Sequence, residues 1–351
     1  MDYLTKYIKE KGNLTFQEAK FNEIDALIYS VLVYVDLTHP KLSNTPIKEA
    51  YNLFTQKFHL KEKDRFSKKN TELFKLMAES PRYEDNLIED YTYIINNKTQ
   101  FGALTIKIPK HFKFIAFMGT NDFLVGWEEN FQMSYLYPMP AQRKAIAYLN
   151  KHIKSTDLIV YTGGHSKGGN LSMAAYMELP WYKKWQVEYV FNFDGPGFLK
   201  ELTDTPKYIK ASKKFISYYP EESIVGMLLH TKGRKKIIKS NKNGINEHDA
   251  HSWKYKENNL LTGELSLASK TFYKRQDNLF NKINEEKRKY FCETFFKILY
   301  TSGYTFKSEL NELHIKKILN LIKNTSKLSN EEKKLIIEVF KSLFDNVNEN
   351  A

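Results

Sequence analysis

Apolar and polar positions follow three different patterns along this chain of 351 residues. From about Phe16 to Glu79, apolar residues recur at helical spacing, which predicts several helices. The Pro40–Pro46 stretch interrupts them with proline and small polar residues, so a turn or loop is expected there. The first part of the chain is therefore predicted to be helical.

The middle of the chain consists of short β-rich runs separated by helical periodicity. The segments Gln142–Ile153 and Gly169–Met177 have the helical spacing, and they lie between successive apolar runs. The predicted strands are Tyr91–Ile95, Ala103–Ile106, Phe114–Met118, Leu158–Thr162, Val187–Phe193 and Phe215–Tyr219. Strands that alternate with helices indicate a mostly parallel sheet with helices on both faces.

After about Ser266 the pattern is helical only. The predicted helices are Leu267–Asn281, Glu286–Tyr300, Lys307–Ile322 and Asn330–Val347. The expected organisation is an α/β core with a helical N-terminal segment over residues 1–265, followed by a C-terminal helical segment over residues 266–351.

Charge alters this picture little. The formal net charge is +13, which could attract nucleic acid or an anionic membrane. However, the basic residues are spread along the chain, and the densest run is Lys232–Lys236. We interpret them as a solvated, lysine-rich surface, with a functional patch for anions or membranes as the alternative. No nucleic-acid partner is expected.

Cysteine and terminal patterns narrow the setting further. The single cysteine, Cys292, allows no internal disulfide and no cysteine-based zinc site, and it is expected to be buried in a helix. No cluster of histidine and glutamate ligands suggests a metal, so no cofactor is expected. The first residues lack the pattern of a secretory signal, and no apolar run is long enough to span a bilayer. A cytoplasmic protein is the expectation.

The strongest chemical signal is a Gly-x-Ser-x-Gly element, Gly164–Gly168, between a predicted strand and a predicted helix. In that setting the serine, Ser166, lies on a tight turn that exposes its hydroxyl at the carboxyl edge of the sheet. The glycines leave room for the close-packed strand and helix. A phosphate-binding loop is excluded because the Gly-Lys-Ser/Thr order is absent. Ser166 is therefore the predicted nucleophile, and the adjacent His165 is interpreted as structural.

A nucleophilic serine needs a base and an acid, which follow it in the order Ser, acid, His in proteins with this element. Asp194 comes just after the strand Val187–Phe193 and is the predicted acid, while Glu221 and Glu222 remain alternatives. The histidines downstream of Asp194 are His230, His248, His251 and His314. His248 is the predicted base and His251 its main competitor.

The developing oxyanion also needs hydrogen-bond donors. The backbone N–H of Lys167, next to the serine, is one expected donor. The strand Phe114–Met118 ends in Gly119-Thr120, and Thr120 is the second expected donor through its N–H and hydroxyl.

These phrases together resemble a known family. Residues 163–171 (GGHSKGGNL), 192–198 (NFDGPGF) and 118–122 (MGTND), with His248-Asp249 before Trp253, are similar to a bacterial family of uncharacterised, lipase-like α/β-hydrolases. The resemblance extends over roughly Leu14 to Trp253 and implies a lipase-like α/β-hydrolase fold. It also implies ester hydrolysis, and Ser166, Asp194 and His248 fall on the matching motif positions.

The predicted function is that of a serine hydrolase that cleaves carboxylic esters, lipid esters included, through a Ser166–Asp194–His248 triad and an acyl-enzyme. A small-molecule or lipid ester is the expected partner, and peripheral contact with an anionic membrane stays open. The alternative is a catalytically silent protein of the same fold that engages an anionic partner through its basic surface. Nucleic-acid binding is a weaker third hypothesis.

Overall fold

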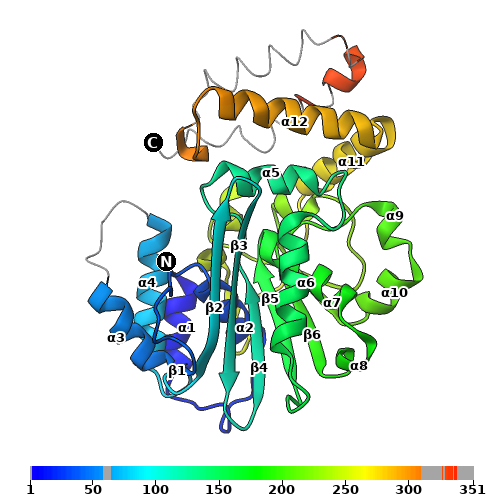
Figure 1. The fold of residues 1–351 in the computed structure, drawn as a ribbon. Coiled ribbons are helices and arrows are strands. Elements are labelled where there is room, and N and C mark those ends of the chain that lie inside the picture. Colours follow the sequence, from blue (N-terminus) through cyan, green and yellow to red (C-terminus); the bar gives the residue numbers. More distant parts are fainter. Residues whose placement is uncertain (1, 58–64, 310–325, 327–328, 335, 338–351) are drawn as a thin grey trace.

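The fold is built on one eight-stranded sheet, shown in Figure 1. The computed structural model describes residues 2–57, 65–309, 326, 329–334 and 336–337. The strands lie side by side in chain order, from β1 to β8. They are β1 (Thr45–Pro46), β2 (Leu87–Asn96), β3 (Thr99–Ile108), β4 (Phe112–Phe117), β5 (Val160–His165), β6 (Val187–Phe193), β7 (Phe215–Pro220) and β8 (Arg234–Ile238).

The sheet has an antiparallel half and a parallel half. β1 to β4 pair antiparallel, and β4 to β8 pair parallel, so four of the seven described pairings within this sheet are parallel. The six predicted strands are all present, within shifts of a few residues. β5 begins later than the predicted Leu158. Its pairing with the segment that leads into β6 starts at Val160, whose N–H donates to the carbonyl of Gln186 at 2.8 Å.

Each face of the sheet carries its own hydrophobic core because side chains alternate along a strand. On β4, Phe114 and Ala116 join the core on one face, while Ile115 and Phe117 join the core on the other. The first core lies under α2 (Glu23–Leu32). The second lies under α6 (Pro140–His152) and α7 (Lys167–Glu178), with α8 (Trp181–Lys184), α9 (Lys200–Thr203) and α10 (Pro206–Ser212) following along the chain. Helices on both faces of this mostly parallel sheet give the α/β-hydrolase fold that the sequence predicts.

The N-terminal segment is helical, as expected. It contains α1 (Tyr3–Lys11), α2, α3 (Ile47–Lys57) and α4 (Arg65–Ala78). α1 begins well before Phe16, where the predicted helical region starts. Its cap is the Asp2 side chain, which accepts hydrogen bonds from the N–H groups of Leu4 and Thr5. Within the predicted loop, Thr45–Pro46 pairs with β2.

The C-terminal helices α11 (Leu267–Lys282) and α12 (Glu285–Thr301) confirm the first two predicted there. They pack on α5 (Leu124–Gln132) at the carboxyl end of β4, at the top of Figure 1. Cys292 is buried in that contact. Of the predicted helix Lys307–Ile322, only the 3₁₀ turn Lys307–Glu309 falls within the described residues. The predicted Asn330–Val347 helix is described as helical over 330–334 and 336–337.

The remaining short elements lie between β7 and α11. They are the 3₁₀ turns Val225–Met227, Gly244–His248 and Ala250–Ser252, and the ribbon of β9 (Tyr255–Lys256) and β10 (Asn259–Leu260). None of the described helices is both long and apolar enough to cross a membrane.

The basic run Lys232–Lys236 gives a strand that the pattern did not predict. Its second half opens β8, which pairs with β7 at the end of the sheet. Arg234 and Lys235 are exposed, in agreement with a solvated surface. Lys236 instead forms an ion pair with Glu23 of α2 at 2.5 Å. Charged residues suit an edge strand because they oppose pairing with another chain.

Candidate active site

Ser166 lies at a sharp turn between β5 and α7. Its backbone has φ 57° and ψ −135°, a conformation that L-residues rarely adopt and that only surrounding contacts can hold. One such contact is the hydrogen bond from its N–H to the carbonyl of Phe193, at 2.9 Å. A Cβ on Gly164 would lie 2.3 Å from the backbone carbon of Gly168. A Cβ on Gly168 would lie 2.0 Å from the carbonyl oxygen of Phe117, so both positions require glycine.

Asp194 and His248, which are far apart in the sequence, meet beside this turn. Asp194 follows β6, has φ 50° and is fully buried. Its Oδ2 lies 2.7 Å from Nδ1 of His248, in the 3₁₀ turn after β8. Its Oδ1 accepts hydrogen bonds from Ser223 Oγ at 2.5 Å and from the N–H of Gly226 at 3.2 Å. The carboxylate is thus held on both oxygens, and one of them holds the imidazole.

His165 connects the serine turn to the His248 turn. Its Nε2 donates to the carbonyl of His248 at 2.7 Å, and the two imidazole rings are 4.5 Å apart. Burial, and then repulsion from His248, lower the pKa of His165 to about 3, so its ring is neutral at physiological pH. His165 therefore anchors the loop that carries His248, which agrees with its interpretation as structural. No described residue forms a hydrogen bond with the Ser166 hydroxyl.

The alternative base candidates have other partners. His251 is buried, with Nδ1 2.8 Å from Asp2 Oδ2 and Nε2 2.8 Å from Asn70 Oδ1. His230 lies 2.8 Å from the hydroxyl of Tyr273. His314 lies outside the described residues.

The alternative acids likewise bond elsewhere. Glu221 accepts a hydrogen bond from the N–H of Glu264 at 3.1 Å, and Glu222 accepts one from the N–H of Gly244. Of the candidates that the structure describes, it brings together Asp194 and His248.

Glu247, next to His248, is a buried carboxyl that the sequence analysis did not single out. Its Oε2 accepts a hydrogen bond from the N–H of Glu222 at 2.7 Å. Burial, opposed by this hydrogen bond and reinforced by the carboxylates of Glu222, Glu221 and Asp194, raises the pKa of Glu247 to about 7. Several carboxyl groups therefore lie close to one another beside the Asp194–His248 pair.

The two segments that carry the predicted oxyanion donors both adjoin Ser166. Lys167 begins α7, and its backbone N–H donates to no described residue. Thr120 follows Gly119, where an added Cβ would lie 2.9 Å from the Cβ of Ser166. The loop after β4 therefore runs directly against the serine. Asn130 Nδ2 donates to the Thr120 hydroxyl at 2.9 Å, so that hydroxyl already has a partner.

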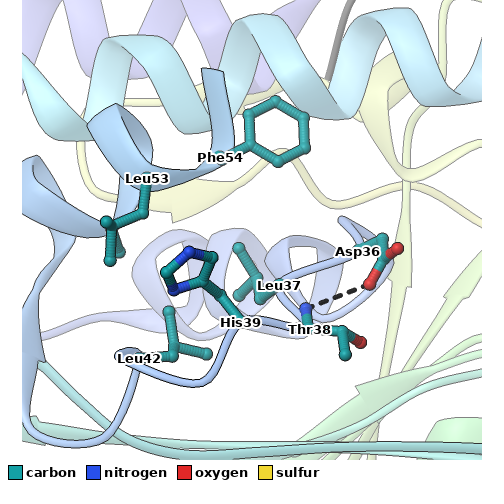
Figure 2. Close-up of a pocket in the computed structure, with 8 residues that line it drawn as sticks. Asp36, Leu37, Thr38, His39, Leu42, Leu53 and Phe54 are labelled. Atoms are coloured by element: carbon teal, nitrogen blue, oxygen red, sulfur yellow. Dashed lines mark hydrogen bonds between the residues drawn. The ribbon is translucent and has the colours of Figure 1, made fainter. Parts of the chain in front are cut away.

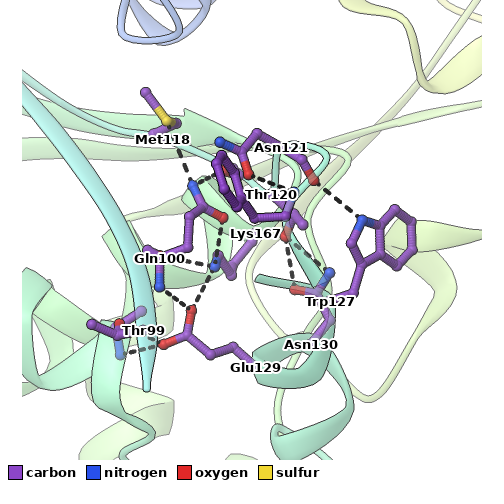
Figure 3. A network of polar contacts seen from close by, with 12 residues as sticks. Thr99, Gln100, Met118, Thr120, Asn121, Trp127, Glu129, Asn130 and Lys167 are labelled. Carbon is purple, nitrogen blue, oxygen red and sulfur yellow. Dashed lines mark hydrogen bonds and ion pairs between the residues drawn. The ribbon is translucent and has the colours of Figure 1, made fainter. Parts of the chain in front are cut away.

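A buried polar network, shown in Figure 3, connects these two segments. The side chains of Lys167 and Glu129 are both fully buried, and Nζ lies 2.7 Å from Oε2. Lys167 Nζ also donates to the carbonyl of Gln100 at 3.0 Å and to its Oε1 at 3.2 Å. Gln100 Nε2 in turn donates to the carbonyl of Gly119 at 3.0 Å, just before Thr120. Lys167 and the Thr120 loop thus share one set of hydrogen bonds.

Sequence reasoning missed Glu129 and Gln100. Glu129 lies in α5 and Gln100 in β3, each within a segment whose pattern shows only its secondary structure. No motif marks either residue, because their role depends on three elements packing together.

A pocket lined by Asp36, His39, Leu42 and Phe54, among others, is shown in Figure 2. This pocket is small, with room for roughly one water molecule. Among the residues that the structure describes, no group of three or more histidine, cysteine or carboxylate side chains could hold a metal ion.

Comparisons with known proteins found a family match and similar solved structures. A model of the Mbeg1-like family matches residues 77–297, which include Ser166, Asp194 and His248. Two solved lipase structures are similar at 14% identity. A fungal lipase in complex with an inhibitor has a TM-score of 0.36, with 44% of this chain and 67% of the lipase covered. The M37 lipase has a TM-score of 0.34, with 59% of this chain and 69% of the lipase covered. No curated protein matches the chain significantly.

Proposed function

This chain belongs to the Mbeg1-like family, and we propose that it is a serine hydrolase that cleaves carboxylic esters, with Ser166 as nucleophile, His248 as base and Asp194 as the acid that orients His248. The observation that carries the proposal is the 2.7 Å contact between Asp194 and His248 beside the strained turn of Ser166. A buried carboxylate bonded to a partly exposed imidazole, next to a serine on such a turn, is the arrangement that acyl transfer requires.

The proposed reaction has two steps. In the first, the Ser166 oxygen attacks the ester carbonyl while His248 Nε2 takes the hydroxyl proton. The tetrahedral intermediate then collapses to an acyl-enzyme, and His248 gives that proton to the departing alcohol. In the second step, water attacks the acyl-enzyme with His248 as base, which releases the acid and restores the serine.

Asp194 stabilises the positive charge that forms on His248 when it takes the proton. Nδ1–H of His248 donates to Oδ2, which sets the tautomer that leaves Nε2 free to accept a proton. Ser223 and Gly226 bond to the other carboxylate oxygen and fix the carboxylate plane. The imidazolium is therefore formed next to an anion that is already held in place.

The proposed oxyanion donors are the N–H of Lys167 and the N–H of Thr120. Two features support this assignment. Lys167 is the first residue of α7, whose N-terminus points at the site. The Gly119-Thr120 loop contacts Ser166. The network through Glu129 and Gln100 holds both segments in one arrangement. We assign no role to the Thr120 hydroxyl, since Asn130 occupies it.

A direct test is labelling with a fluorophosphonate, followed by hydrolysis of short-chain p-nitrophenyl esters. We expect the wild type to be labelled and Ser166→Ala to be unlabelled. The turnover of Ser166→Ala should be lower by about 10⁴-fold or more, because without the serine hydroxyl no acyl-enzyme can form. The thermal midpoint should change little, since the hydroxyl has no partner among the described residues.

Ser172→Ala is the matched control. Ser172 lies on the same helix, is fully buried, and donates to the carbonyl of Gly169 at 2.8 Å. We expect this variant to be labelled like the wild type. If the wild type is not labelled, or Ser166→Ala keeps more than about a tenth of the rate, the hydrolase proposal is wrong. An unlabelled wild type would favour the catalytically silent alternative.

A further inference from the structure

An exposed aromatic patch lies at the end of the sheet where β5 and β6 begin, opposite the end that carries Ser166. We define it as Trp181, Tyr182 and Trp185. They lie in and just after α8, at the lower right of Figure 1. Their exposed fractions are 84%, 55% and 63%, which is unusual for side chains this large. Neighbouring aromatic residues with this exposure mark an interaction surface more often than a surface that faces only water.

Two exposed aliphatic residues extend the patch. Leu158 and Ile159, just before β5, are 77% and 42% exposed. Gln186, next to Trp185, joins this segment to α8. Its Nε2 donates to the carbonyls of Lys154 and Asp157 at 2.6 Å, and its carbonyl accepts from the N–H of Val160 at 2.8 Å. The apolar surface therefore spans two neighbouring connections at one edge of the sheet.

Lysines lie within the patch and around it. Lys183 and Lys184 lie within it, and their ammonium groups donate to the carbonyls of Asn150 at 2.6 Å and Met177 at 2.9 Å. Burial, and then repulsion from Lys207, lower the pKa of Lys184; Glu178 opposes this effect, and Lys210 adds to it. Glu178 is itself paired with Lys207, so positive charge is in excess at this edge.

We propose that this patch docks the protein on an anionic lipid surface. Trp and Tyr favour the boundary between headgroups and acyl chains, and lysine ammonium groups favour anionic headgroups. A symmetric dimer through the same patch would bring the lysines of two copies together, which opposes self-association. Single-stranded nucleic acid would stack on the aromatic rings but would gain little from Leu158 and Ile159.

Docking through this edge has a geometric consequence. β5 runs from the patch to Ser166 over six residues, or roughly 20 Å, so the serine faces away from the docked surface. Binding to lipid would then fix where the protein resides without covering the site. This inference does not depend on the hydrolase proposal, because the patch and Ser166 lie at opposite ends of β5.

The test is sedimentation of the full chain with large vesicles, either of phosphatidylcholine alone or of equal parts phosphatidylcholine and phosphatidylglycerol. We expect binding to the anionic vesicles and little binding to the neutral ones. The Trp181→Ser/Trp185→Ser variant should bind at least about tenfold more weakly. Lys207→Gln/Lys210→Gln should weaken binding by about fivefold for each lysine removed. Brominated lipids should quench the tryptophan fluorescence of the wild type more than that of Trp181→Ser/Trp185→Ser.

The controls alter residues near the other edge of the sheet. Leu267→Ser removes a side chain that is 79% exposed on α11, and Lys270→Gln/Lys274→Gln removes two exposed charges there. Both should bind like the wild type, and all variants should keep the thermal midpoint and the rate on a water-soluble ester.

Several results would overturn the proposal: no binding of the wild type to anionic vesicles, equal binding to neutral vesicles, or unchanged binding of the Trp181→Ser/Trp185→Ser variant. Loss of self-association in that variant would show instead that the patch joins two copies. Loss of oligonucleotide binding would show that it takes nucleic acid.

Discussion

The buried ion pair of Lys167 and Glu129 offers a test in which stability and catalysis should separate. Lys167→Met removes the ammonium group and leaves the Glu129 carboxylate buried. That carboxylate keeps three donors, namely Thr99 Oγ1 at 2.7 Å, the N–H of Gln100 at 3.2 Å and the N–H of Ala141 at 3.0 Å. Removing one member of such a pair typically costs about 3–5 kcal/mol of unfolding free energy, and we expect a loss in that range.

Neutralising both partners should restore part of that loss. In Lys167→Met/Glu129→Gln, the new Oε1 can still accept from Thr99 and Ala141. The new Nε2 can donate to Gln100 Oε1, which Lys167 Nζ contacts in the wild type. The N–H of Gln100 is then the group left without its acceptor, which costs about 1–3 kcal/mol. The unfolding free energy of the double variant should therefore lie within about 3 kcal/mol of the wild-type value.

Catalysis should not recover in parallel. Both variants keep the backbone N–H groups of residues 167 and 120, but the backbone carbonyl of Gln100 loses the ammonium group that holds it. The side chain of Gln100 in turn holds the carbonyl of Gly119. A small displacement of the oxyanion donors lowers kcat by up to about a hundredfold while leaving substrate affinity nearly unchanged. We expect kcat to fall and KM to stay close to its wild-type value in the double variant.

The measurements are urea denaturation followed by circular dichroism, and steady-state hydrolysis of one short-chain ester. Lys113→Met is the matched control, because Lys113 is 4% exposed and pairs with Glu89 and Asp157 at 2.9 Å, away from the Gly119 loop. It should lose stability and keep kcat. The reasoning is refuted if Lys167→Met loses less than about 1 kcal/mol, or if Lys113→Met lowers kcat as much as the double variant does.

Further predictions concern the residues around Ser166. Asp194→Asn should lower kcat on a short-chain ester by about 10⁴-fold, because the amide favours the wrong imidazole tautomer; a loss under tenfold would exclude Asp194 as the orienting acid. The unfolding free energy of Ser166→Gly should exceed that of Ser166→Ala by about 1 kcal/mol, because glycine relieves the strained backbone. Equal urea midpoints of the two variants would argue against strain. The pKa of His165 is lowered from 6.5 to about 3, so the stability it contributes is complete above pH 6.5 and is lost as the pH falls towards 3. The stability advantage of wild type over His165→Asn should thus shrink by about 1.4 kcal/mol per pH unit below 6.5, and a constant difference would contradict the buried neutral ring. The pKa of Glu247 is raised from 4.5 to about 7, so its contribution is complete below pH 4.5 and is lost as the pH rises through 7. Glu247→Gln should therefore gain thermal midpoint relative to wild type as the pH rises across that window, and a gain independent of pH would rule out this cause.

The sequence alone determined the features that depend on neighbours along the chain. Short apolar runs such as Phe114–Met118 predicted the strands, and the alternation with helices predicted the layered sheet, because both patterns follow from local geometry and burial. The glycines around Ser166 predicted its sharp turn for the same reason. Local composition failed at β8, since a charged run such as Arg234–Ile238 becomes a strand only when β7 offers its free edge.

Only the tertiary structure decided which distant residues meet. The sequence offered four histidines and three acids after Ser166 as candidates, and it favoured His248 and Asp194 but left His251, Glu221 and Glu222 open. Folding places His248 against Asp194 and commits His251 to Asp2 and Asn70. Glu129 and Gln100 join Lys167 for the same reason. A buried charge must find its partner across elements, and that choice depends on how the elements pack and not on the residues beside it in the chain.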